Sequence, residues 1–217
     1  MEIDLVRELK EIFKDSDMNT GEVRKISSKY YKKLPTQNID DVLKICESLL
    51  EERTWELGVI AYDWAFRMRK QYNEETFDIF ESWLKKYVTD WGDCDDFCTH
   101  AFGELLRQRK ELFTKVLKWT QSERFPVRRA AAVILIYSIR KDDYDGLKPL
   151  KVADRLMYDD HHLVLKGYGW MLKVLSQKEP DTVYDYVDEN RDMPRVSLRY
   201  AIEKFSDEKR KELMNKN

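Results

Sequence analysis

Glycine and proline are scarce in this sequence, with 7 glycines and 5 prolines among 217 residues. Both residue types interrupt helices, so the chain has few helix breakers. Long runs of β-branched residues are missing as well, which disfavours an extended β-sheet. Leucine, lysine, glutamate, arginine, alanine and methionine are plentiful, and these side chains lose little freedom in a helix. The composition therefore predicts an all-α protein.

Long apolar segments are also missing. The sequence has no run of about 18 apolar residues, the length that a membrane-spanning helix needs. Residues 1–5 include two acids and lack the apolar centre of a secretion signal. The 3 cysteines, Cys46, Cys94 and Cys98, are few, as is typical of a reducing compartment. We therefore expect a cytoplasmic protein that does not contact membranes.

The sequence contains only part of a metal-binding motif. Cys94 and Cys98 stand one helical turn apart, and His100 follows closely. A zinc site needs a fourth ligand, which usually comes from a second paired motif, and the sequence offers none. We therefore expect buried structural cysteines, with no metal and no other cofactor.

Charge is nearly balanced overall but unevenly distributed. The formal net charge is −2, so the whole chain lacks the basic excess typical of nucleic-acid-binding proteins. Residues 1–100 contain 15 basic and 22 acidic side chains, whereas residues 101–217 contain 24 basic and 19 acidic ones. The basic half is a candidate surface for phosphate, and chance segregation of charge is the alternative.

Apolar residues recur at intervals of three and four almost throughout, which predicts amphipathic helices. The expected helices cover residues 2–14, 20–34, 39–51, 54–70, 74–89, 93–108, 110–119, 126–141, 147–157, 160–176, 180–189, 194–205 and 207–214. Pro126, Pro180 and Pro194 fit first turns, where the missing N–H is harmless. No long linker separates these segments, so we expect one domain over residues 1–217.

A weak internal repeat runs through the helices. Arg129, Lys166 and Arg199 begin similar segments and are separated by 37 and 33 residues. Gly58, Cys94 and Ala131 follow one another at 36 and 37 residues. Repeats of this length built from paired helices are typical of α-solenoids, in which stacked pairs share one core. We predict an α-solenoid with a concave groove, and an ordinary helical bundle is the alternative.

In such a solenoid the small residues of the repeat have a packing role. Gly58, Ala131 and Gly167 would let the inner helices approach closely. Arg129, Lys166 and Arg199 would then occupy equivalent early positions of successive inner helices. The prediction is a row of basic side chains along the groove.

Residues 90–100 form the most unusual segment, with acids at positions 90, 93, 95 and 96 around the start of a predicted helix. Acids are favoured at a helix N-terminus because the helix dipole is positive there. Asp96 lies further inside the helix, on the face that also carries Gly92 and His100. Asp96 is therefore a candidate functional carboxylate, and a buried acid tied to the backbone or to Arg129 is the alternative.

Three segments in this order resemble the HEAT-like-repeat DNA alkylation repair glycosylases of the AlkD type. WGDCDD at residues 91–96 is similar to the family's Trp-Trp-Asp-x-Val-Asp signature. WTQSERFPVRRAA at residues 119–131 resembles a stretch in which a tryptophan leads to an arginine at the start of a helix. LKGYGWMLK at residues 165–173 resembles the family's Lys-x-x-Gly-Trp-x-Leu pattern. The resemblance covers roughly residues 50–205.

The resemblance implies a HEAT-repeat solenoid that holds duplex DNA carrying alkylated bases, and we expect it to act as a monomer. It further implies excision of purines made cationic by an alkyl group on N3 or N7. Such a base leaves as a neutral molecule, so the enzyme must mainly stabilise the positive sugar and orient water, which a carboxylate can do. The family's aspartate maps to Asp96, which is thus the expected catalytic residue. The expected DNA-binding residues are Trp91, Arg128, Arg129, Lys166, Trp170, Lys173 and Arg199.

One position departs from the family pattern, because the second signature tryptophan falls on Gly92. Some relatives keep this fold without excising bases, so a non-catalytic HEAT-repeat protein that binds DNA or a protein partner is an alternative. A metal hydrolase built on Asp93, Asp95, Asp96 and His100 is a further alternative, although it lacks a second group of ligands.

Overall fold

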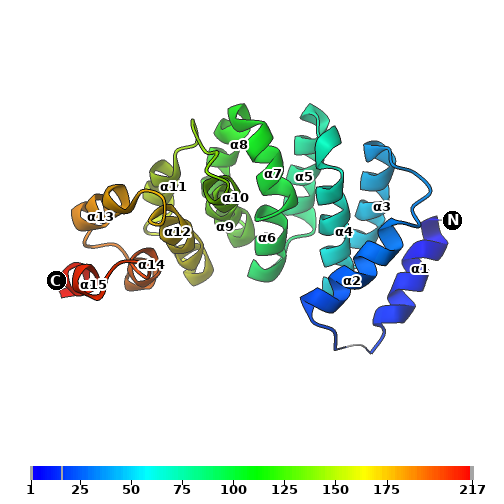
Figure 1. Cartoon of the computed structure of the whole chain (residues 1–217), viewed down its shortest axis with the longest axis horizontal. Coiled ribbons are helices and arrows are strands. Elements are labelled where there is room, and N and C mark those ends of the chain that lie inside the picture. Colours follow the sequence, from blue (N-terminus) through cyan, green and yellow to red (C-terminus); the bar gives the residue numbers. More distant parts are fainter. Residues whose placement is uncertain (1, 16, 216–217) are drawn as a thin grey trace. The chain divides into compact units, whose positions relative to one another are not determined.

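The computed structural model describes residues 2–15 and 17–215. In these ranges the regular secondary structure consists of helices, without strands (Figure 1). This confirms the prediction of an all-α protein. Within the same ranges, no helix combines the length and the apolar character needed to cross a bilayer. Contacts divide the chain into two compact units, Met1–Leu105 and Leu106–Asn217. The expectation of one domain over residues 1–217 stays a prediction.

The first unit centres on one buried helix. Its helices are α1 (Glu2–Phe13), α2 (Thr20–Tyr31), α3 (Ile39–Glu51), α4 (Trp55–Arg67), η1 (Arg69–Gln71), α5 (Glu74–Lys86), α6 (Trp91–Cys98) and the start of α7 (Ala101–Gln108). Helix α4 packs against α1, α2, α3 and α6. Its residues from Leu57 to Ala65 are all buried, and Asp63 is the one charged side chain among them.

Aromatic side chains fill the core between α5, α6 and α7. The ring of Phe80 lies 5.2 Å from that of Phe97 and 5.5 Å from that of Phe102, both nearly edge-on. Such edge-to-face pairs stabilise more than their buried area alone. Cys46, Cys94 and Cys98 are buried, as expected, and burial raises the pKa of the Cys46 thiol.

The second unit centres on α12 (His162–Leu175). The other helices of this unit are η2 (Lys110–Leu112), α8 (Phe113–Lys118), η3 (Trp119–Gln121), α9 (Phe125–Val133), α10 (Leu135–Arg140), α11 (Pro149–Leu156), α13 (Pro180–Glu189), α14 (Arg195–Ala201) and α15 (Asp207–Asn215). Helix α12 contacts α9, α10, α11, α13 and α14.

Two glycines allow α12 to approach its neighbours. A Cβ at Gly169 would lie 2.9 Å from the Tyr200 Cβ and 3.0 Å from the Ser197 backbone of α14. A Cβ at Gly167 would lie 3.1 Å from Cγ of Arg129 on α9. The close approach predicted for Gly167 is thus confirmed. The same prediction for Gly58 is wrong, because a Cβ there would meet only the Tyr62 ring, at 3.9 Å.

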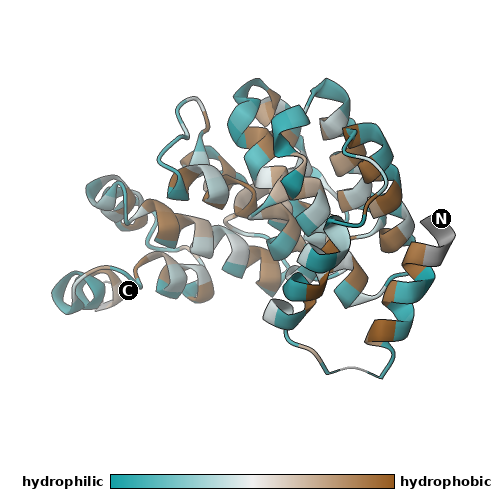
Figure 2. Ribbon diagram, turned by 45° about the vertical axis from the view of Figure 1, so that its right-hand side comes forward, coloured by the Kyte–Doolittle hydropathy of each residue, from teal (hydrophilic) through white to brown (hydrophobic). Residues whose placement is uncertain are grey.

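Within each unit, helices follow one another as stacked antiparallel pairs, and α2, α4 and α6 lie side by side in the first (Figure 1). Single helices carry apolar residues on one side and polar residues on another (Figure 2). An apolar stripe on each helix is what a stack of repeats buries. The fold agrees with the predicted α-solenoid of helical repeats, and the groove along it stays a prediction.

Most predicted helices occur with boundaries within a few residues, but some are divided. The helix expected over 110–119 comprises η2 and α8, and the one over 54–70 comprises α4 and part of η1. The helix expected over 93–108 is split into α6 and α7, and the one over 126–141 is split into α9 and α10 at Ile134. Pro126 and Pro180 lie in first turns, as predicted, whereas Pro194 precedes α14 as its N-cap residue.

Candidate functional site

Helix α6 begins after an extended residue, Asp90, whose side chain caps it. The Asp90 side chain accepts a hydrogen bond from the Trp91 N–H at 2.7 Å, which satisfies one of the free donors at the helix start. The Trp91 side chain that follows is about half exposed, at 52%. Apart from its chain neighbours and the backbone of its own helix, a Cβ built on Gly92 meets no atom of the described residues within 4 Å. Position 92 therefore has room for a larger side chain.

Two side chains contact the last carbonyl groups of helix α6. The Thr99 hydroxyl donates to the Asp95 carbonyl at 2.7 Å. The Nδ1 atom of His100 lies 2.9 Å from the Asp96 carbonyl oxygen, which would otherwise accept from the N–H four residues on. The Asp95 carbonyl still accepts from the Thr99 N–H, whereas the His100 N–H donates to the Phe97 carbonyl instead of the Asp96 carbonyl. The His100 side chain thus competes with the helix where the predicted helix over 93–108 is broken. The break turns the His100 ring back toward Asp96.

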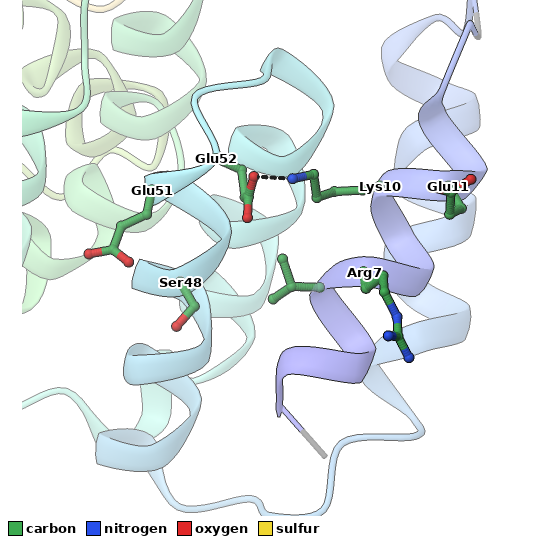
Figure 3. Close-up of a pocket in the computed structure, with 7 residues that line it drawn as sticks. Arg7, Lys10, Glu11, Ser48, Glu51 and Glu52 are labelled. Atoms are coloured by element: carbon green, nitrogen blue, oxygen red, sulfur yellow. Dashed lines mark hydrogen bonds and ion pairs between the residues drawn. The ribbon is translucent and has the colours of Figure 1, made fainter.

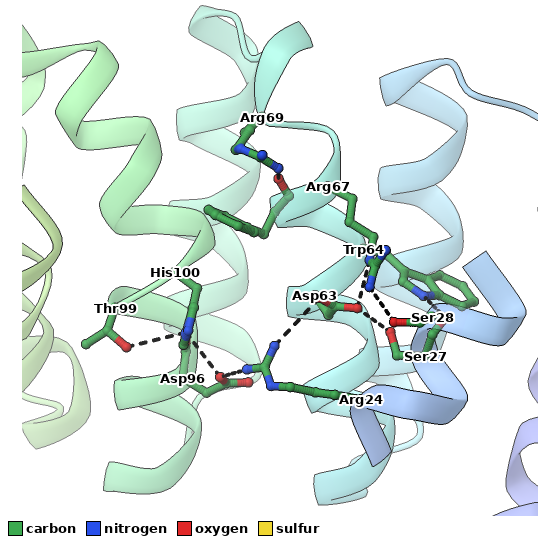
Figure 4. A network of polar contacts seen from close by, with 11 residues as sticks. Arg24, Ser27, Ser28, Asp63, Trp64, Arg67, Arg69, Asp96, Thr99 and His100 are labelled. Atoms are coloured by element: carbon green, nitrogen blue, oxygen red, sulfur yellow. Dashed lines mark hydrogen bonds and ion pairs between the residues drawn. The ribbon is translucent and has the colours of Figure 1, made fainter. Parts of the chain in front are cut away.

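The Asp96 carboxylate is held by two basic side chains on one of its oxygens. Its Oδ1 atom accepts a hydrogen bond from a guanidinium nitrogen of Arg24 on α2 and lies 3.3 Å from Nδ1 of His100 (Figure 4). The other oxygen, Oδ2, is buried and has no hydrogen-bond partner within the described residues. The side chain as a whole is 16% exposed. A buried carboxylate oxygen without a donor is costly, so it marks a place where a ligand or water is needed.

A second acid, Asp63 of α4, lies on the far side of Arg24. Its Oδ1 atom is 3.6 Å from Nη1 of Arg24 (Figure 4). Its Oδ2 atom accepts from the Ser27 hydroxyl at 2.5 Å and from Nε of Arg67 at 2.9 Å. Neighbouring helices α2, α4 and α6 thus contribute two carboxylates and two guanidinium groups, whose formal charges cancel.

Further bonds fix the position of α2 against α4. The indole N–H of Trp64 donates to the Ser27 carbonyl at 3.1 Å, and Arg67 donates to the Ser28 hydroxyl at 2.7 Å. These bonds tie the helix that carries Arg24 to the helix that carries Asp63. We refer to Arg24, Asp63, Asp96 and His100 together as the Arg24 network.

Hydrogen bonding and burial shift the pKa values of two groups in and near this network, His100 and Asp93. The hydrogen bond to the Asp96 side chain raises the pKa of His100, although burial and Arg24 oppose the shift. Burial raises the pKa of Asp93, and Asp90 and Asp96 add to the effect. The Asp96 side chain thus favours the charged form of the neighbouring imidazole relative to a free histidine.

The sequence interpretation missed Arg24, although a signal for it exists. Arg24 is the fifth residue of α2, as Arg129, Lys166 and Arg199 are the fifth residues of α9, α12 and α14. The equivalence predicted for the last three is confirmed by this shared position. A search for a basic residue at the fifth position of the N-terminal helices would have identified Arg24.

In the second unit, Arg129 is a packed side chain rather than an exposed one. It is 5% exposed and donates a hydrogen bond to the Leu163 carbonyl at the start of α12. Its aliphatic part lies against Gly167. The predicted row of basic side chains is therefore interrupted at this position, because the guanidinium is used to join α9 to α12.

Two other predicted DNA-binding residues have acidic partners. Arg128 binds Asp159 at 2.6 Å and Asp160 at 2.9 Å, and its side chain is 15% exposed. The interaction with Asp159 raises the pKa of Arg128. Lys173 binds Glu203 at 3.0 Å. Phosphate contacts from Arg128 and Lys173 stay a prediction and would require these pairs to open.

The remaining predicted residues of this unit differ in exposure. Trp170 is half-buried, and the Arg140 guanidinium lies 5.5 Å from its ring centre, over the indole face. Lys166 is half-buried, and Arg199 is exposed. Trp91 and Asp96 belong to the first unit, and the other predicted residues belong to the second. Their convergence in one groove stays a prediction.

A separate hollow of about 530 Å³ lies between α1 and α3 (Figure 3). It is lined by Val6, Arg7, Lys10, Glu11, Ser48, Glu51 and Glu52, and an ion pair between Lys10 and Glu52 crosses it. None of these residues belongs to the Arg24 network. Across the described residues, no cluster of three or more histidine, cysteine or acidic side chains has the arrangement of a metal site.

Comparisons with known proteins agree with this architecture. The sequence pattern of the family described as DNA alkylation repair enzyme matches residues 7–205. A solved structure described as a predicted DNA alkylation repair enzyme from Enterococcus faecalis superposes with a TM-score of 0.75. The match covers 94% of this chain and 96% of that chain at 16% identity, so it shows similarity of fold. No curated protein matches the sequence.

Proposed function

Because this chain belongs to the DNA alkylation repair enzyme family, we propose that it is a DNA glycosylase that excises N3- or N7-alkylated purines from duplex DNA. The family match itself supports a function in DNA alkylation repair, with DNA as the partner. The excision reaction and its residues are the proposal. Its main support is the Asp96 carboxylate, which is held on one oxygen while its second oxygen is buried without a donor.

In the proposed reaction the bond between C1′ of the sugar and the purine nitrogen breaks, and its electron pair leaves with the base. The alkylated purine is a cation, so it departs neutral and needs no acid. The sugar becomes an oxocarbenium-like cation, which Asp96 stabilises by its negative charge. Water then adds to C1′, and Asp96 orients this water and takes up the proton that it loses.

Side chains near the start of α6 are suited to holding the lesion. The exposed Trp91 indole offers a face to a cationic base, and cations are attracted to such faces. In the second unit, we propose that Arg128, Arg129, Lys166, Trp170, Lys173 and Arg199 contribute to binding the duplex. Exposed Arg199 and half-buried Lys166 are the most accessible of these to a phosphate.

The test is release of the base from duplex DNA that contains 7-methylguanine or 3-methyladenine, measured under single-turnover conditions. Asp96→Asn is expected to slow release by about 100-fold or more, the usual effect of removing one group that stabilises transition-state charge. Asp90→Asn is a matched control on the same helix, because it removes the same charge while asparagine still caps the helix. No release by the wild-type protein, even in large excess over DNA, would refute the enzymatic proposal.

A second candidate is a non-catalytic member of the family that binds DNA or a protein. Gly92 favours it, because the aromatic side chain of the family signature is missing there. This protein would bind duplex without releasing a base, and Asp96→Asn would then leave no enzymatic effect to measure. Binding to DNA that falls steeply as salt rises would identify a phosphate-contacting protein rather than a protein-binding one.

A further inference from the structure

Arg24 lies on α2 between two carboxylates that do not depend on it equally. Asp63 is satisfied without it, because the Ser27 hydroxyl and the Arg67 guanidinium both donate to Asp63 Oδ2. Arg24 approaches Asp63 only to 3.6 Å, which is an ion pair longer than a hydrogen bond. Its hydrogen bond goes to Asp96. The charge of Arg24 therefore serves mainly to neutralise Asp96.

We propose that Arg24 is a phosphate-binding residue that pairs with Asp96 in the free protein and moves to a phosphate of the duplex when DNA binds. The transfer would remove the guanidinium charge from the Asp96 carboxylate at the moment when DNA is present, with His100 as its remaining basic neighbour. This inference rests on the proposed function of Asp96 and concerns the control of that residue by DNA binding.

The exposure of the two side chains allows this exchange. The Arg24 side chain is 31% exposed, whereas that of Asp96 is 16% exposed. A guanidinium has five donors in a planar fork, so Arg24 has donors left for a phosphate while it still contacts a carboxylate. The pair is partly buried, and replacing the carboxylate by a phosphate keeps the guanidinium paired, so Arg24 is never left as an isolated charge.

The charges of the two groups also favour a transfer of Arg24 from Asp96 to a phosphate. A carboxylate that keeps a guanidinium on its oxygen acts on a nearby cation as an almost neutral pair, because the two charges offset each other. Asp96 can stabilise an oxocarbenium ion strongly only after Arg24 has turned away. The competing explanation is that Arg24 never moves and simply fixes the orientation of Asp96.

A double-mutant cycle on the affinity for unmodified duplex separates the two explanations. If Asp96 and DNA compete for Arg24, Asp96→Asn releases the guanidinium and tightens binding. The tightening is expected to be about fivefold, within the range of coupling between residues in contact. In a protein that already carries Arg24→Gln, the Asp96→Asn substitution should not tighten DNA binding. Equal tightening in both backgrounds would mean a general loss of negative charge and would overturn the proposal, as would no tightening at all.

The salt dependence of binding gives a second measurement. Loss of one phosphate contact lowers the slope of log affinity against log salt by about 0.9. Arg24→Gln should show this change, whereas Arg67→Gln should not. Arg67 is a matched control, because its side chain is 33% exposed and it pairs with Asp63 and not with Asp96. An unchanged slope for Arg24→Gln, or equal changes for both variants, would overturn the proposal.

Folding and function are checked separately. Arg24→Lys keeps the charge, so its slope of log affinity against log salt should stay close to that of the wild type. Thermal unfolding of each variant identifies any loss of structure. All these measurements use unmodified duplex and no excision. A wild-type protein that releases no base but shows the coupling refutes the proposed enzyme and leaves the Arg24 exchange supported. If the protein releases the base but DNA affinity shows no coupling between Asp96 and Arg24, the Arg24 exchange is refuted and the proposed enzyme is not.

Discussion

Replacing Asp63 by alanine is expected to destabilise the first unit more than most single substitutions would. Asp63 is 9% exposed in the middle of the buried helix α4. The substitution removes the acceptor of the Ser27 hydroxyl and of the Arg67 guanidinium. It also leaves Arg24 and Arg67 near each other without the carboxylate between them.

The magnitude follows from these contacts. Each hydrogen bond to a charged group contributes about 1.5–3 kcal/mol, so the two bonds to Oδ2 set an upper range of about 3–6 kcal/mol. The Arg24 and Arg67 side chains are 31% and 33% exposed and can turn to water, which reduces the loss. Alanine also has a higher helix propensity than aspartate, by about 0.5 kcal/mol. We therefore expect a net loss of about 2 kcal/mol, because these two effects offset roughly half of the upper range.

Thermal unfolding followed by circular dichroism measures this loss. For a chain of this length, about 2 kcal/mol corresponds to a decrease of roughly 4–8 °C in the unfolding temperature. Asp181→Ala is the control, because that side chain is 89% exposed and its removal is expected to change stability by no more than about 0.5 kcal/mol. If Asp63→Ala unfolds at the temperature of Asp181→Ala, the Arg24 network does not stabilise the fold as described.

Three further predictions concern the helices and the site. Gly169→Ala should lower the unfolding temperature, because its Cβ would lie 2.9 Å from that of Tyr200 and overpacking costs about 1–3 kcal/mol, whereas Gly92→Ala should not lower it. His100 has a raised pKa through its bond to Asp96, so its stabilising effect should be complete below about pH 6.5 and lost as pH rises through the higher folded value. Unfolding temperatures of the wild type and His100→Gln should accordingly converge as pH increases, and a difference that grows with pH would contradict this assignment. Gly92→Trp should fold normally, since position 92 is open, and should increase the single-turnover rate of base release if the missing indole limits catalysis.

The fold was largely predictable because its signals are local or repeat at a fixed distance. Apolar spacing located the helices, and the recurrence of Arg129, Lys166 and Arg199 identified equivalent positions that the structure confirms. The break between α6 and α7 was not predictable in the same way. It depends on whether Thr99 and His100 turn their side chains to backbone carbonyls, which apolar spacing does not report.

The site was only partly predictable because its contacts join distant segments. The signature segment pointed to Asp96, but its partner Arg24 lies 72 residues earlier in the chain. Residues at equivalent positions of the repeat also differ in environment. Arg129 is buried because Gly167 leaves room for it, whereas Arg199 is exposed. The position within the repeat identifies candidate basic residues. The packing of neighbouring helices then determines which of these side chains are exposed to solvent.

The acidity of the first 100 residues does not by itself make the site unsuitable for DNA. Asp63 and Asp96 are balanced by Arg67 and Arg24, so these four side chains are formally neutral together before a ligand arrives. An enzyme of the proposed kind must attract a polyanion and then stabilise a cation, and a permanently free carboxylate would oppose the first step. A carboxylate neutralised by a transferable arginine meets both requirements, because the arginine contributes to DNA binding and its departure supplies the charge for catalysis. The proposed exchange therefore explains why the candidate catalytic acid is paired in the free protein.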